Sequence, residues 1–145
     1  MIEKIQQEMK AAMKSGDKLK LGVLRMTLSE LKNAVIAKGG ELDEGEMLAT
    51  IQKALKKREE AAAAFSDGGR EEQAAKEESE AEILRAYLPD KLSPEDLEKA
   101  IDEVIAETGA TSKREMGQVM KEIMSRYRGR VDGKEVQGLV ASKLD

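Results

Sequence analysis

The stretch "YLPDKLSPED", residues 87–96, contains both prolines of the chain and separates two groups of predicted helices. Pro89 disfavours the helical conformation in the residue before it, so a helix is expected to end there. Ser93 is a typical N-cap residue, and Pro94 suits the first position of the helix that follows. The pattern therefore predicts a boundary between two helical subdomains.

The N-terminal subdomain, residues 1–90, is predicted to contain about four helices. Its clearest apolar stripe, with intervals of three or four residues, comprises Leu21, Leu24, Leu28, Leu31 and Val35. Such spacing marks one buried face of a helix. Asp43 and Glu46 have the spacing of a capping box, which predicts the start of another helix. The predicted helices span residues 2–14, 17–38, 43–67 and 70–87.

The C-terminal subdomain, residues 91–145, is predicted to be a bundle of three short helices. The first begins after Ser93. The second is predicted to begin with a capping box formed by Ser112 and Glu115, and the third begins after Asp132. The predicted fold class is therefore all-α, with four helices in the first subdomain and three in the second.

The composition supports this fold class and excludes several kinds of catalytic site. The 145 residues include three aromatic residues and two prolines, and such a composition favours helix over sheet. The chain has no histidine and no cysteine, which removes Ser-His-Asp triads, Cys-His dyads and zinc sites built from His and Cys. Its serines lie in no nucleophile elbow, and no Walker loop is present. We expect no cofactor, no metal and no catalytic site.

The distribution of charge is more informative than the net charge of −4. Residues 71–82 contain six glutamates against one lysine, whereas residues 113–143 contain eight Lys and Arg residues against four acidic ones. A role in nucleic-acid binding would therefore depend on a local patch. No segment has the apolar length of a signal peptide or a membrane span, so we expect a soluble cytoplasmic protein.

The candidate nucleic-acid contacts lie in and around the stretch "MGQVMKEIMSRYRGRVDGKEV", residues 116–136. They are Lys113, Arg114, Lys121, Arg126, Arg128, Arg130 and Lys134. One interpretation is that these cations meet backbone phosphates. The alternative is that Arg126 and Arg128 stabilise the carboxyl end of the preceding helix, by about 0.3 to 1 kcal/mol each.

The same stretch contains residues with expected structural roles. Gly117 predicts a close helix crossing, and Met120 is expected in the core together with the methionines four residues before and after it. Gly129 and Gly133 would let the backbone of the bend approach a ligand. Asp132 is expected to cap the last helix, which leaves that helix end unavailable to a phosphate.

Charged residues in the first subdomain also admit two interpretations. Glu78 and Glu82 share a helical face, which suits either a solvated surface or a pair of carboxylates that holds Mg²⁺. Arg58 is predicted to bind carboxylates of the fourth helix and thereby to tie two helices together. Arg25 and Asn33 are interpreted as polar anchors between helices.

Several segments together resemble the YqeY family of small bacterial proteins. They are "VLRMTLSELKNA", "KKREEAAAAFSDGGR", "EAEILRAYLPDKLS", "MGQVMKE" and "GRVDGKEV", in this order along the whole chain. The last two are similar to the tail domain of GatB, a subunit of the glutamine-dependent aminoacyl-tRNA amidotransferase. That tail often has a small residue at the position of Val131 and proline at the position of Gly133.

The resemblance implies a helical fold of two subdomains and contact with tRNA. It also implies an amidotransferase or an aminoacyl-tRNA synthetase as a protein partner. The family name suggests a carbon–nitrogen ligase, but the chain supplies no catalytic residue for that reaction. Two functions stay open. The first is a tRNA-binding accessory protein, and the second is a protein-interaction module that docks through a helical face and does not contact RNA. The oligomeric state is open as well.

Overall fold

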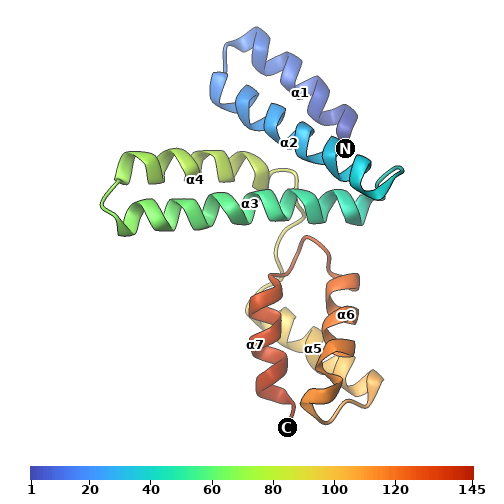
Figure 1. The fold of residues 1–145 in the computed structure, drawn as a ribbon. Helices are drawn as coiled ribbons and strands as arrows, with labels where there is room; N and C mark the ends of the chain where they lie inside the picture. The colour runs from blue at the N-terminus through green and yellow to red at the C-terminus, as the bar shows by residue number, and fades with distance from the viewer. The chain divides into compact units, whose positions relative to one another are not determined.

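A computed structural model describes all residues, Met1–Asp145, and contains no strand. The all-α prediction is confirmed. The helices are α1 (Ile2–Ser15), α2 (Lys18–Lys38), α3 (Glu44–Asp67), α4 (Glu71–Arg85), α5 (Pro94–Thr108), the 3₁₀ helix η1 (Lys113–Glu115), α6 (Met116–Arg126) and α7 (Gly133–Lys143), as shown in Figure 1. No helix combines the length and the apolar character needed to cross a membrane.

The chain forms two compact units, Met1–Leu88 and Pro89–Asp145, called unit 1 and unit 2 below. In unit 1, α1 packs along α2, and α3 packs along α4 (Figure 1). In unit 2, α6 packs against both α5 and α7. The predicted division of the chain into domains 1–90 and 91–145 stays a prediction.

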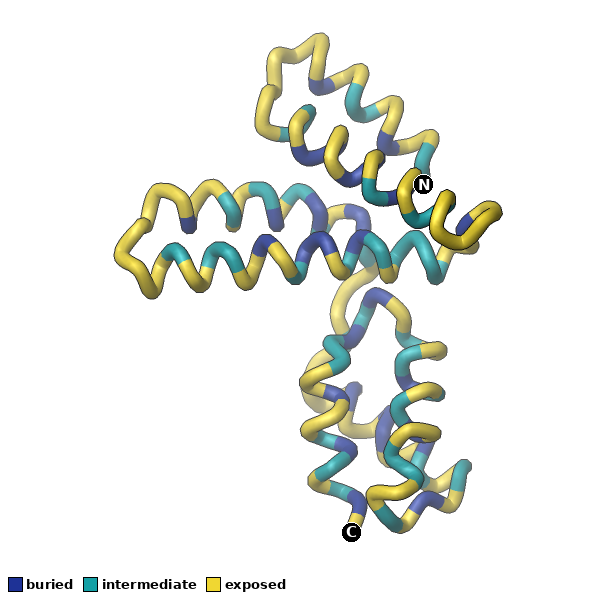
Figure 2. Tube along the Cα trace, viewed as in Figure 1, coloured by how far each residue is buried: buried dark blue, intermediate teal, exposed yellow.

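The core of unit 1 contains the stripe that the sequence predicted on α2. Leu24, Leu28 and Leu31 are buried, together with Ile51 and Leu55 of α3. Val35 is half-buried against this core, whereas Leu21, at the start of the predicted stripe, is half-buried and is not part of it. Figure 2 shows that buried and exposed positions alternate along α2. This alternation follows from the helical period, because positions three or four residues apart face the same side.

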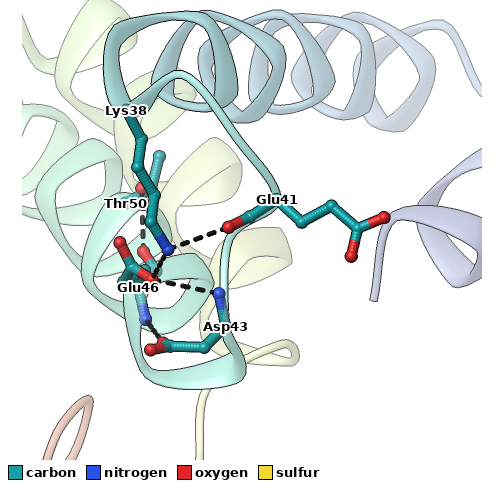
Figure 3. Close-up of polar contacts among 5 residues, drawn as sticks. All are labelled: Lys38, Glu41, Asp43, Glu46 and Thr50. Atoms are coloured by element: carbon teal, nitrogen blue, oxygen red, sulfur yellow. Dashed lines mark hydrogen bonds and ion pairs between the residues drawn. The ribbon is translucent and has the colours of Figure 1, made fainter.

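The corner between α2 and α3 is held by polar side chains (Figure 3). Asp43 accepts a hydrogen bond from the backbone N–H of Glu46 at 2.7 Å, and Glu46 accepts one from the backbone N–H of Asp43 at 3.1 Å. The predicted capping box is therefore confirmed. Lys38 Nζ donates to Glu46 Oε1 at 2.5 Å, and this bond is the main cause that lowers the pKa of the Glu46 carboxyl.

Arg58 of α3 is buried between helices. Its Nε lies 3.5 Å from Oε2 of Glu80 on α4, and its guanidinium also donates to the carbonyl of Ala54 at 3.3 Å and to Sδ of Met26 at 3.4 Å. The prediction that Arg58 ties α3 to a carboxylate of α4 is confirmed. Arg25 and Asn33 both lie exposed on α2, so their interpretation as interhelical anchors is wrong.

The core of unit 2 is entirely apolar. Its buried side chains include Ile101 and Val104 of α5, Ile123 of α6, and Val136 and Val140 of α7. The start of α5 is as predicted, because Ser93 Oγ accepts a hydrogen bond from the backbone N–H of Asp96 at 3.1 Å and Pro94 is the first helical residue. Three short amphipathic helices bury one face each, and this arrangement fixes which residues of unit 2 remain exposed.

Candidate nucleic-acid interface

The bend between α6 and α7 depends on Gly129. This residue is buried and has a φ of 77°, in the left-handed region that glycine adopts without steric cost. The backbone N–H of Arg130 donates to the carbonyl of Tyr127 at 2.9 Å, which closes the turn, and Val131 is buried just after it. The bend is thus a tight connection with a partly buried backbone.

Arg130 fastens this bend to the segment that leads into α5. Its carbonyl accepts a hydrogen bond from the backbone N–H of Leu92 at 3.0 Å, and its Nε donates to the carbonyl of Asp90 at 2.9 Å. The residue is half-buried. Its guanidinium therefore has a structural partner within unit 2.

Arg126, in the last turn of α6, is held by two carboxylates. Its Nη2 lies 2.5 Å from Oε2 of Glu107 on α5, and its Nε lies 3.1 Å from Oε2 of Glu122, one turn earlier on α6. The hydrogen bond from Arg126 lowers the pKa of the Glu107 carboxyl, and the same bond raises the pKa of Arg126. This geometry is what the alternative interpretation requires, in which Arg126 stabilises the end of its helix.

Arg128 is exposed and also has an interaction within the chain. The three arginines that lie close together in the sequence, Arg126, Arg128 and Arg130, therefore have different surroundings. The first is ion-paired and the third is bonded to a backbone carbonyl. The bend does not present them as three equivalent cations.

The other predicted contacts are more available. Lys113, Arg114, Lys121 and Lys134 are all exposed, and their side chains have no ion pair. Lys121 lies on an outer face of α6 that also contains Gly117, Gln118 and Ser125 at helical spacing, all exposed and none of them acidic. We call Arg114, Gly117, Gln118, Lys121 and Ser125 the outer α6 face.

Two structural predictions near this face are wrong. Gly117 is not a close helix crossing, because a Cβ built there meets no atom within 4 Å. Ser112 forms no capping bond with its side chain. Instead η1 precedes α6, and the backbone N–H groups of Glu115 and Met116 are satisfied by the carbonyls of Ser112 and Lys113.

Other predictions for this region are confirmed. The side chain of Asp132 caps α7 by accepting a hydrogen bond from the backbone N–H of Lys134 at 3.0 Å. Met120 is half-buried against the core of unit 2, as are Met116 and Met124. The expectation that Gly129 and Gly133 let the backbone approach a ligand stays a prediction. Gly133 is the first residue of α7, and a Cβ there would lie 3.9 Å from the methyl group of Met124, an ordinary contact distance.

Three of the six glutamates of α4 serve as partners for arginines. Glu78 and Glu82 bind Arg85 Nη1 at 2.7 and 2.8 Å, and these contacts raise the pKa of Arg85. Glu80 is the partner of Arg58. No group of three or more His, Cys, Asp or Glu side chains is arranged to hold a metal ion. Glu78 and Glu82 are largely exposed, so the interpretation of their face as solvated surface holds, although both also pair with Arg85.

The sequence did not reveal the partners of Arg126 and Arg130. Glu107 lies 19 residues before Arg126, and Asp90 lies 40 residues before Arg130. Neither separation corresponds to a helical repeat, so no local pattern indicates the contact. Only the pair formed by Arg126 and Glu122 has the spacing of four residues that a sequence pattern can suggest.

These features define a small all-helical protein whose second unit exposes cations on the outer side of a helix. The family model described as Yqey-like protein matches residues 2–144, and the chain belongs to this family. The resemblance found in the sequence is thereby confirmed. A comparison with curated proteins gives no match.

Proposed function

We propose that this YqeY-family protein binds structured RNA through the outer α6 face and has no catalytic role of its own. The observation that carries the proposal is that Arg114 and Lys121 are exposed without a carboxylate partner, and that the other members of the outer α6 face, Gly117, Gln118 and Ser125, carry no acid. A cation already neutralised by a carboxylate gains less from a phosphate, because the first ion pair must be broken. Arg126 is therefore a weaker candidate than Lys121.

Phosphate recognition is the mechanism that this surface supports best. The chain has three aromatic residues and no tryptophan, which is few for a platform that stacks unpaired bases. Lysine and arginine side chains instead suit the backbone of a folded RNA. Gly117 leaves open space at the centre of the face, so an RNA backbone can approach α6 closely there.

The net charge of −4 does not oppose such binding at short range. At physiological ionic strength the screening length is about 8 Å, so each cation acts mainly on its immediate neighbourhood. Arg114 and Lys121 are seven residues apart, a separation of about 10 Å along a helical path. Two cations at this spacing can contact different phosphates of one RNA strand.

The class of RNA comes from the resemblance of the last segments to the GatB tail. We propose tRNA as the ligand and an accessory role beside an amidotransferase or an aminoacyl-tRNA synthetase. Lys113 and Lys134 are exposed and lie in the same unit, so they are the next candidates for phosphate contacts. Arg128 is a further candidate because the residue is exposed.

The test is tRNA binding by the purified protein over a series of salt concentrations. Each true phosphate contact that is removed should lower the slope of log K against log salt by about 0.9 for a duplex-like target. We expect this change for Lys121→Ala and for Arg114→Ala. Lys143→Ala is the matched control, because it removes the same charge from a lysine already paired with Asp102 at 2.8 Å and Glu98 at 3.2 Å.

Equal slopes for wild type, Lys121→Ala and Arg114→Ala would exclude the outer α6 face as the RNA site. A purified protein that does not bind tRNA even at low salt would overturn the proposal as a whole. In that case the alternative function, a protein-interaction module without RNA contact, is favoured.

A further inference from the structure

Helix α2 has a second face whose residues are exposed, and one of them, Met26, also accepts a hydrogen bond at Sδ from Arg58 of α3 at 3.4 Å. Its core side includes Val23, Leu24, Leu28 and Leu31. On the other side six exposed positions follow each other at alternating intervals of three and four residues: Leu19, Gly22, Met26, Ser29, Asn33 and Ile36. We call these six residues the outer α2 row. None of them is charged, in a chain in which 37% of the residues are charged.

The outer α2 row contains most of the exposed large apolar side chains of the protein. Only four such side chains are exposed in the whole chain, and three of them are Leu19, Met26 and Ile36, with exposed fractions of 38%, 57% and 77%. The fourth is Met13 of α1, and unit 2 has none. Apolar groups aligned along one exposed helix face indicate a surface that is covered by a partner.

The shape of this row suits another helix. The intervals of three and four residues are those of the seam in a pair of packed helices. Gly22 and Ser29 are small and alternate with larger side chains, and a Cβ at Gly22 would meet no atom within 4 Å. Such positions leave holes into which side chains of a partner helix fit. The row spans 17 residue steps, or about 25 Å of helix.

A line of cations borders the row. Lys18, Arg25 and Lys32 are seven residues apart, all exposed and without an ion pair. Each directly precedes a member of the outer α2 row, so all three lie along the same edge of it. In packed helices such edge positions face the edge of the partner helix, where opposite charges favour binding.

We propose that the outer α2 row binds an amphipathic helix of another protein, whose apolar side chains cover Leu19, Met26 and Ile36 and whose carboxylates face the line of cations. This goes beyond the proposed RNA binding and concerns a different unit of the chain. A helix with acidic residues every seventh position along one edge complements the three cations. Phosphates alone would pair with the cations but would leave the apolar side chains in water.

A second copy of this chain fits the surface less well. Antiparallel pairing of two α2 helices about a twofold axis would place the cation line of one copy opposite the same line of the other. Repulsion between Lys18, Arg25 and Lys32 of the two copies would then oppose association. The charges along α2 therefore favour a partner with an acidic edge.

The experiment is photo-crosslinking in cells, with a photoreactive amino acid in place of Ser29. The expected product is a protein adduct whose crosslinked segment is an amphipathic helix with Asp or Glu at intervals of about seven residues. A synthetic peptide of that segment should bind the purified protein. The triple variant Lys18→Glu, Arg25→Glu, Lys32→Glu should weaken this binding by a factor of ten or more.

Matched variants distinguish a loss of partner binding at the outer α2 row from a loss of folding. Ile36→Asp should abolish the adduct, whereas Met13→Asp, at the exposed apolar residue outside the row, should leave it unchanged. Both side chains are largely exposed, so thermal unfolding should be unaffected by either. The absence of an adduct at Ser29, or an adduct with RNA, lipid, a second copy of the chain or a segment without an acidic edge, would overturn this proposal. None of these results changes the expected salt slopes for Lys121→Ala.

Discussion

The two units use charged side chains in different places. In unit 1 a guanidinium, that of Arg58, is buried between α3 and α4 beside the carboxylate of Glu80. In unit 2 no polar side chain is buried, and the paired cations Arg126 and Lys143 lie at the rim with partly exposed carboxylates. The difference teaches that the strength with which an ion pair holds its arginine in this protein depends on how deeply the pair is buried. A buried pair holds the arginine within the fold, whereas a pair at the rim can exchange with solvent.

The units also differ in how their corners are fixed. The corner between α2 and α3 in unit 1 depends on side chains, with the capping box of Asp43 and Glu46 joined by Lys38. In unit 2 the segment before α6 is instead held by backbone hydrogen bonds. The chain end at Asp145 exchanges backbone bonds with the segment before α6, accepting from Lys113 N–H and donating to the carbonyl of Thr111, both at 3.2 Å.

The largest expected effect is the loss of the half-buried Glu80 carboxylate that pairs with the buried Arg58 in unit 1. Glu80→Ala would leave the guanidinium of Arg58 charged and buried with no opposite charge within reach. We expect the free energy of unfolding to fall by about 3 kcal/mol, as when one partner of a buried pair is removed. Denaturant unfolding followed by circular dichroism measures this change.

Two further variants test whether that loss comes from uncompensated charge. The double variant Arg58→Met, Glu80→Leu replaces the pair with apolar side chains and should recover most of the stability. Glu77→Ala removes a carboxylate of the same helix that has no ion pair, and we expect a change within about 0.5 kcal/mol. Equal losses for Glu77→Ala and Glu80→Ala would show that the ion pair with Arg58 does not distinguish these glutamates, which are both half-buried.

Much of the fold could be predicted because its signals are local. The stripe on α2, the N-cap at Ser93 and the capping box at Asp43 all involve residues within one or two turns of each other, and each has the predicted structure. Ser112 and Glu115 have the same spacing as Asp43 and Glu46, yet they form no capping box. Spacing alone did not reveal that the backbone near Ser112 takes a 3₁₀ turn.

Two glycines of unit 2 should respond oppositely to alanine. Gly129 has a positive φ and is buried in the bend, so Gly129→Ala should lower the free energy of unfolding by about 1 to 2 kcal/mol. Gly117 is the second residue of α6 and has open space around it, so Gly117→Ala should raise stability, by about 0.5 kcal/mol. Thermal unfolding of both variants beside wild type measures whether each substitution lowers or raises stability. A destabilised Gly117→Ala would indicate a neighbour close to that position.

Two residues with similar capping patterns provide a test of how the corners are fixed. Asp43→Ala removes a side-chain acceptor at the start of α3 and should cost about 1 kcal/mol. Ser112→Ala removes a hydroxyl that makes no capping bond, and its effect on stability should be close to zero. Equal costs for both substitutions, measured by denaturant unfolding, would contradict the view that unit 2 fixes this corner through its backbone.

The candidate site was less predictable than the fold because its decisive contacts are distant in sequence. The cluster of arginines at positions 126, 128 and 130 is visible in the sequence, but Glu107 and the carbonyl of Asp90 are brought to it only by the packing of α5. The same packing leaves Arg114 and Lys121 without carboxylate partners. A net count of charges over residues 113–143 cannot distinguish the cations that have partners within the fold from those that have none.

The smallest expected effect is at the rim of unit 2, and it depends on pH. Arg126 holds the pKa of the Glu107 carboxyl below its ordinary value of 4.5. A carboxyl with a lowered pKa in the folded state adds stability above its unfolded pKa, and this contribution is lost as the pH falls through the folded pKa. Glu107→Gln should therefore be slightly less stable than wild type at pH 7, with the difference disappearing under acid conditions.

Because this pair lies at the surface, the difference at pH 7 should be far smaller than for Glu80→Ala, and it should shrink further at high salt. Glu103→Gln, at an exposed residue of α5 with no ion pair, is the control and should show no such dependence on pH or salt. Melting curves from pH 3 to pH 7 measure both variants. A loss for Glu107→Gln as large as that for Glu80→Ala, and insensitive to salt, would mean that the rim pair of unit 2 supports the fold as strongly as the buried pair of unit 1. Arg126 would then contribute to stability as much as Arg58 does, and it would be excluded as a cation that can exchange its carboxylates for a phosphate.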